Sequence, residues 1–139
     1  MFKKILLPVD LSDRHQQALD VATQLASQGG GEIILLHVIE VIPGLAMEEE
    51  KDFYKRLERM ARKHLEPLGA RLKERGVRFR AELIFGSRGR EVVKYAQDSE
   101  ADLIVLTAPR LDPANALAGW GSLSHKISLV SPCPVLLVK

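Results

Sequence analysis

The sequence lacks most features of a secreted, membrane-bound or strongly charged protein. It has a single cysteine, Cys133, so no disulfide can form within the chain, and we interpret this residue as a small, partly buried side chain. No apolar run reaches transmembrane length, and the short run after Lys3 and Lys4 is interrupted at Pro8, too early for a signal peptide. The formal net charge of +2 gives no general attraction to nucleic acid or membranes. We therefore expect a cytoplasmic protein with neither of these partners.

Motifs of the common nucleotide-binding and catalytic loops are also missing. The sequence contains no Gly-x-x-x-x-Gly-Lys-Ser/Thr loop, no Gly-x-Gly-x-x-Gly fingerprint and no Gly-x-Ser-x-Gly elbow. The four histidines show no metal-ligand spacing with one another or with Cys133. We interpret His37, inside an apolar run, as structural and His64 as a packing residue. His15 and His125 lie near expected helix starts and could act only through tertiary placement. We predict a binding protein, not an enzyme, without a metal site.

Short apolar runs alternate with segments of helical periodicity along the whole chain. Four such runs predict strands, at residues 5–9, 33–38, 103–106 and 135–138. Residues 77–85 alternate between apolar and polar side chains and predict a fifth strand, at an edge of the sheet. Helices are expected between them, at 12–27, over the charged segment from 48 to 76, after Ser87 and at 121–130. This alternation predicts one α/β domain, residues 1–139, in which an open parallel sheet is covered by helices on both faces.

Capping and breaking residues predict where the helices begin and end. Ser12 is expected to cap the first helix, and the three glycines from Gly29 to end it. Pro67 is expected to kink or interrupt the second helix, because proline removes a backbone donor. Two apolar faces are expected to be buried, one on each helix. They consist of Ala18, Val21, Ala22, Leu25 and Ala26, and of Phe53, Leu57, Met60, His64 or Leu65, Leu68 and Leu72.

The loops after Val9, Val38 and Leu106 form the expected site, because ligands of open parallel sheets bind at the carboxyl ends of the strands. Asp10 follows the first of these strands. It is either a local helix cap or an acceptor for a ligand hydroxyl or amino group. Gly121–Ser122 opens the last helix, where a glycine permits close backbone approach and free N–H groups attract anions.

Five segments in chain order resemble the universal stress protein family over the whole chain. They are Pro8–Ser12, Leu35–Val38, Ala101–Leu106, Gly121–Ser122 and Ser131–Val138. The run Pro-Cys-Pro-Val-Leu-Leu-Val in the last segment is the most specific. The resemblance implies an adenine-nucleotide alpha-hydrolase-like sheet of strand order 3-2-1-4-5 and a role in the stress response. It also implies a homodimer through the C-terminal strand, which an unpaired sheet edge would suit.

The phosphate-binding motif of that family is altered here. Nucleotide-binding members carry Gly-x-x-Gly, nine residues and then Gly-Ser/Thr after the fourth strand. In this sequence Thr107 and Arg110 stand at the two glycine positions, and ten residues separate Arg110 from Gly121–Ser122. A β-branched residue resists a positive φ, and a Cβ at each position would crowd the phosphates. The resemblance therefore implies a degenerate nucleotide-binding motif.

The rest of the implied site is intact, because the family's adenine and ribose contacts correspond to Pro8, Asp10 and Val38. Two interpretations follow. In the first, which we favour, the site is lost and the protein is a dimeric interaction module without a cofactor. In the second, ATP or AMP with Mg²⁺ still binds, because the Arg110 guanidinium could hold phosphate directly. An enzyme that acts on an adenylated substrate would rest on fold analogy alone. The second interpretation predicts a site made of Pro8, Asp10, Val38, Arg110, Gly121 and Ser122.

Overall fold

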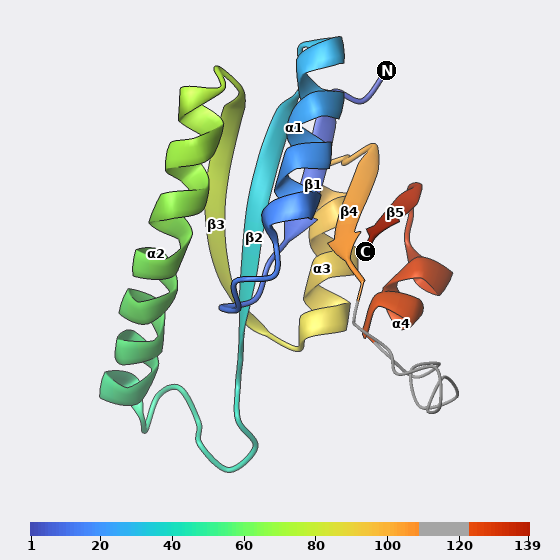
Figure 1. Ribbon diagram of the computed structural model, residues 1–139. Coiled ribbons are helices and arrows are strands. Elements are labelled where there is room, and N and C mark those ends of the chain that lie inside the picture. Colours follow the sequence, from blue (N-terminus) through green and yellow to red (C-terminus); the bar gives the residue numbers. More distant parts are fainter. Residues whose placement is uncertain (109–122) are drawn as a thin grey trace, which may run out of the picture.

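Strands and helices alternate along the chain in the computed structural model, which describes residues 1–108 and 123–139 (Figure 1). The strands are β1 (Lys4–Pro8), β2 (Glu32–Glu40), β3 (Arg78–Gly86), β4 (Leu103–Thr107) and β5 (Val135–Val138). The helices are α1 (Gln16–Gly29), α2 (Lys51–Glu74), α3 (Arg88–Asp98) and α4 (Leu123–Val130). Each of the five expected strands is therefore present.

The strands form one parallel sheet in the order β3-β2-β1-β4-β5, which confirms the predicted α/β fold and strand order. β1 lies at the centre, with Lys4 opposite Glu32 on β2 and Ile5 opposite Leu103 on β4. β3 and β5 are the two edges. Both faces of the central strands are buried, and for this reason their sequences are almost continuously apolar.

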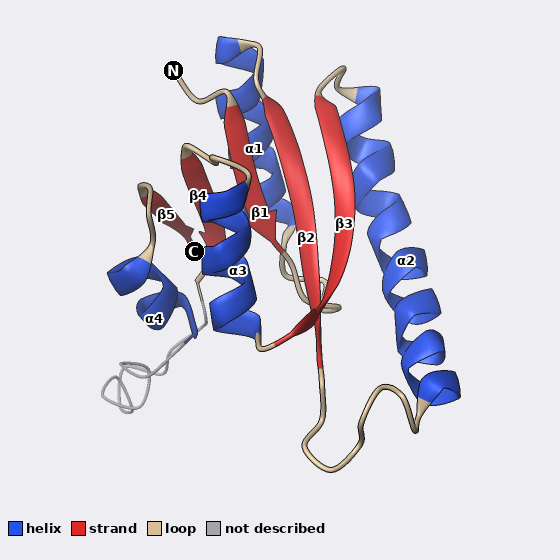
Figure 2. Cartoon of the chain, turned by 180° about the vertical axis from the view of Figure 1, so that it is seen from behind, coloured by secondary structure: helices blue, strands red, loops and turns tan. Residues whose placement is uncertain are grey.

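Two helices cover each face of the sheet (Figures 1 and 2). Alternate residues of the central strands point to opposite faces, so Leu7 belongs to one core and Leu6 to the other. The first core contains α1 and α2, and the second contains α3 and α4. The helix residues of the first core include Ala18, Leu19, Ala22, Ala26, Leu65, Leu68 and Leu72, and those of the second are Val92, Ala96 and Ile127.

The start of α1 differs from the expectation. Ser12 does not cap the helix, which begins at Gln16 after His15. The Ser12 N–H instead donates to Asp10 Oδ1 at 2.8 Å, so the Asp10 carboxylate stabilises a turn ahead of the helix. The expected end is confirmed, because Gly30 adopts a left-handed φ of 65° that favours glycine.

Helix α2 corrects two expectations. It runs past Pro67 without interruption. Proline has no N–H to donate to the carbonyl four residues earlier, but Pro67 lies on the exposed side of the helix, where water can hydrate that carbonyl. Its buried face also runs through Ala61 and not through Met60, whose exposed fraction is 55%. On α1, similarly, Leu19 is buried where Val21 was expected. Neighbouring residues of a helix point about 100° apart, so sequence spacing alone did not separate these alternatives.

Truncation of two α2 residues should separate the observed buried face from the predicted one. Leu72→Ala removes a fully buried side chain and should lower the free energy of unfolding by about 2–5 kcal/mol. Met60→Ala should change it by less than about 0.5 kcal/mol, because that side chain is already in water. Urea unfolding followed by circular dichroism, at one protein concentration, measures both. Equal losses in the two variants would contradict the assigned face.

Candidate functional site

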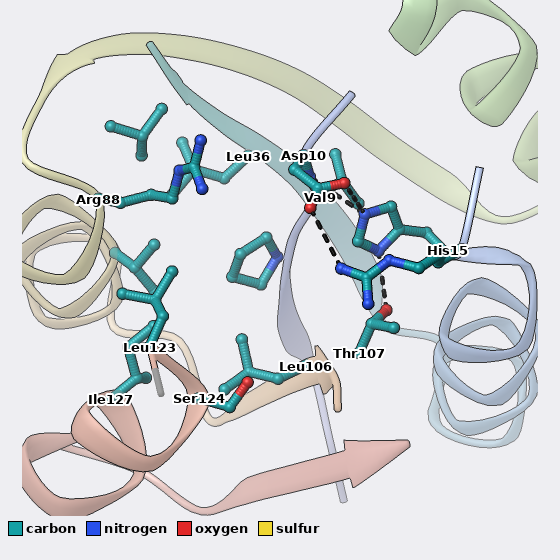
Figure 3. A pocket seen from close by; sticks show the side chains of 14 residues that line it. Val9, Asp10, His15, Leu36, Arg88, Leu106, Thr107, Leu123, Ser124 and Ile127 are labelled. Atoms are coloured by element: carbon teal, nitrogen blue, oxygen red, sulfur yellow. Dashed lines mark hydrogen bonds and ion pairs between the residues drawn. The ribbon is translucent and has the colours of Figure 1, made fainter. Parts of the chain in front are cut away.

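A pocket of about 190 Å³ lies at the carboxyl edge of the sheet (Figure 3). Residues from the carboxyl ends of β1, β2 and β4 line it, together with the N-terminal parts of α3 and α4, so the ends of the three strands meet where the site was expected. Its apolar wall consists of Leu36, Val38, Val92, Leu106, Leu123 and Ile127. Its polar groups come from Asp10, Arg14, His15, Arg88, Thr107 and Ser124.

His15 bridges two of these polar groups. Its Nε2 atom lies 2.7 Å from Asp10 Oδ1, and its Nδ1 atom lies 2.7 Å from Thr107 Oγ1. Figure 3 shows the three side chains together on one side of the pocket, with Arg88 across from them. The His15 side chain is only 6% exposed. A buried imidazole thus joins the loop after β1 to the end of β4.

The short contact to Asp10 favours one protonation pattern for His15. A carboxylate oxygen and an unprotonated ring nitrogen would repel each other at 2.7 Å, so Nε2 carries a proton and donates to Asp10 Oδ1. In the neutral ring, Nδ1 then accepts the hydroxyl proton of Thr107. The Asp10 N–H also lies 3.1 Å from Nε2, but in this pattern it donates no hydrogen bond to the ring because Nε2 is itself a donor.

Hydrogen bonds keep the Asp10 carboxyl ionised. Its burial by itself raises the pKa, but hydrogen bonds from Ser12 and His15 outweigh burial and hold the pKa well below its usual range. These bonds engage Oδ1, whereas Oδ2 has only a long contact of 3.5 Å to the Arg14 guanidinium. Oδ2 is therefore the oxygen with spare capacity to accept a hydrogen bond from a ligand.

His37 is a structural residue, as expected. It is buried in β2, and its Nδ1 atom lies 2.8 Å from the Val9 carbonyl oxygen. Burial lowers the pKa of His37, and the hydrogen bond to Val9 opposes this only in part. A neutral ring whose N–H donates to that carbonyl holds β2 against the end of β1.

The structure brings together half of the predicted site. Pro8, Asp10 and Val38 line the same pocket. Arg110, Gly121 and Ser122 lie outside the described residues.

Three further pocket residues were missed as site candidates, namely Arg14, Arg88 and Ser124. Arg88 follows β3, so the rule that ligands bind at strand ends could have indicated it. Arg14 and Ser124 gave no comparable signal. The role of His15 follows only from its tertiary contacts to Asp10 and Thr107.

Within residues 1–108 and 123–139, no three His, Cys, Asp or Glu side chains come together in a way that could hold a metal ion. In the same ranges, no helix combines the length and the apolar character that a membrane span requires.

Comparisons with known proteins agree with this architecture. The sequence model of the universal stress protein family matches residues 1–139. Universal stress protein YxiE of Bacillus subtilis is 31% identical, over 100% of both chains. The solved structure of MJ0577 from Methanocaldococcus jannaschii has a TM-score of 0.83 at 29% identity, and covers 100% of this chain and 96% of its own. A universal stress protein from Archaeoglobus fulgidus in complex with dAMP has a TM-score of 0.74 at 20% identity, over 99% and 98% of the two chains.

The strand order and the edge pocket define a parallel α/β protein of the adenine-nucleotide alpha-hydrolase-like class. Within that class, the chain belongs to the universal stress protein family, a family of stress-response proteins.

The Asp10 network predicts a specific pH dependence of stability. Folding lowers the pKa of Asp10 below its ordinary value of 3.8. The ionised carboxylate therefore stabilises the folded state above pH 3.8, and this stabilisation is lost as the pH falls below that value. Asp10→Asn should unfold more easily than wild type near pH 7, and the difference should shrink between about pH 5 and pH 3.

Urea unfolding at several pH values measures this difference. Asp13→Asn, at an exposed position outside the network, is the matched control. A difference between wild type and Asp10→Asn that stays constant down to about pH 3 would show that the Asp10 charge does not stabilise the fold.

Proposed function

We propose that this protein is a cytoplasmic homodimeric regulator of the stress response, formed by one domain over residues 1–139. It acts by binding protein partners and not by turnover, and its nucleotide site is degenerate. The stress-response role is that of its family. The proposal adds the mode of action, and it is supported by the contents of the pocket.

One observation carries the proposal, namely the hydrogen bond of 2.7 Å between Thr107 and His15. Thr107 stands where the family's first phosphate-loop glycine is expected, and its side chain lines the pocket. A nucleotide would have to compete for groups that His15 already engages, including Asp10 Oδ1. The pocket volume of about 190 Å³ is also below the range of about 300–1,000 Å³ that is typical of small-molecule sites.

An adenine-nucleotide sensor is the second candidate function. It is favoured by the shared pocket of Pro8, Asp10 and Val38, and by the free capacity of Asp10 Oδ2. The Archaeoglobus fulgidus relative, which was solved with dAMP, has the same fold. In this candidate, Arg110 and Gly121–Ser122 would hold the phosphates of ATP or AMP with Mg²⁺.

Nucleotide content distinguishes the two functions. The freshly purified protein is denatured, and the supernatant is separated on a nucleotide-resolving column with mass detection. We expect no stoichiometric nucleotide, and no heat when ATP and Mg²⁺ are titrated into the native protein. A near-equimolar nucleotide that is lost in Asp10→Ala but retained in Asp13→Ala would contradict the interaction module and support the adenine-nucleotide sensor. In Asp10→Ala the acceptor Oδ2 is absent, whereas Asp13 is outside the pocket lining.

The homodimer is proposed from the free edge of the sheet. β5 pairs with β4 on one side, and among the described residues no strand pairs with its other side. Leu136 and Leu137 on this edge strand are 37% and 44% exposed. An unpaired apolar edge is a ready site for a second strand, and a second copy of β5 supplies one.

Negative charges introduced on β5 should therefore prevent dimer formation. The double variant L136E/L137E introduces carboxylates on both faces of β5, and two such strands would repel each other when paired. We expect wild type to have the mass of a dimer in size-exclusion chromatography with light scattering, and the variant that of a monomer. M60E, on the exposed side of α2, is the control and should remain dimeric. A monomeric wild type would rule out this arrangement.

A further inference from the structure

A second concave region lies between α3 and α4, which pack side by side on the same face of the sheet (Figure 2). It is a groove of about 600 Å³. It adjoins the pocket described above, because Arg88, Leu123 and Ile127 line both. Residues of β5 do not line the groove, so it is separate from the proposed dimer edge.

The groove combines an apolar surface with positive charge. Its apolar residues are Val93, Leu123, Ile127 and Val130, and Val130 is 64% exposed. Its cationic residues are Arg88, Arg90, Lys94 and Lys126. Among the described residues that line the groove, Glu40 is the one acidic residue, and it lies 3.8 Å from Arg88. The groove therefore has an excess of positive charge.

Three of these cations lack a partner within the described residues, since no ion pair there involves Arg90, Lys94 or Lys126. The whole chain has a formal net charge of only +2, so this excess is a local property of the groove and not a reflection of composition. Like charges beside an apolar surface repel one another, and an anionic partner would relieve that repulsion.

We propose that the α3–α4 groove binds an acidic segment of a partner protein. Apolar side chains of the segment lie against Val93, Leu123 and Val130, and its carboxylates face Arg90, Lys94 and Lys126. Peptides bind between helices in this way when a short apolar stripe enters a groove and charges at the rim set the orientation. No aromatic side chain is among the described residues that line the groove, whereas sites for single-stranded nucleic acid use aromatic side chains to stack bases.

This inference rests on the proposed role as an interaction module and specifies the class of partner. Its test uses groove residues that do not line the nucleotide pocket, Lys94 and Lys126. Nucleotide content and oligomeric mass are measured on the same preparations. A negative peptide-binding result therefore leaves the nucleotide and oligomer measurements unaffected. A monomeric protein, or one that contains nucleotide, is detected independently of peptide binding.

The experiment selects peptides on the full-length protein. A displayed library of random dodecapeptides is sorted on wild type, and the enriched sequences are synthesised with a fluorescent label. We expect enriched peptides with two or more carboxylates around apolar residues. In anisotropy titrations, K94E/K126E should weaken their binding by about tenfold or more, because two attractive contacts become repulsive. Replacement of the peptide carboxylates by amides should weaken binding to wild type by a similar factor.

K51E/K55E is the matched control, because it reverses two exposed charges on α2, on the opposite face of the sheet. Its affinity should stay within about twofold of wild type. Circular dichroism verifies that both double variants are folded, and V130S, which adds no charge, tests the apolar part of the groove. The absence of enriched acidic peptides, or equal losses in both double variants, would overturn the proposal. So would oligouridine that binds as tightly as the peptides and is equally weakened by K94E/K126E, since the groove would then bind polyanions in general.

Discussion

The burial of β1 on both faces is the constraint on which the other features rest. Leu6 and Leu7 are completely buried on opposite sides, so helices must cover both faces and crossovers must carry the chain between neighbouring strands. The end of β1 then lies between the ends of β2 and β4. Asp10 leaves the sheet at that point, and the pocket lies there.

Much of this fold could be predicted from the sequence, because buried parallel strands have a distinctive apolar composition and the resemblance supplied the strand order. Helix faces were predicted less well. Met60 and Ala61 are both apolar neighbours, and only packing against the sheet decides which of them is buried. Ser12 is a good cap by propensity, but its N–H donates to the Asp10 carboxylate in a turn that precedes the helix, and α1 begins only at Gln16.

The candidate site was predictable in outline and not in its chemistry. The strand-end rule indicated Asp10, Val38 and the loop that begins at Thr107. In the bridge from Asp10 through His15 to Thr107, the last two residues are 92 positions apart in the chain, and no local pattern encodes such a contact. It also changes the interpretation of Thr107. Beyond the loss of a glycine, this residue supplies a hydroxyl that holds the pocket's polar groups together.

The two edges of the sheet are chemically unlike, and this limits how copies of the protein can assemble. Along β3, Arg78 and Arg80 are exposed, and Arg80 lies near Glu32 of the neighbouring strand. Charges of this kind discourage the addition of a further strand. β5 presents leucines instead. In the proposed dimer, pairing through β5 would occupy the apolar edge of each copy, and the continuous sheet would have a charged border at both ends. Strand addition would then stop at two copies, whereas two apolar edges would permit open-ended fibres.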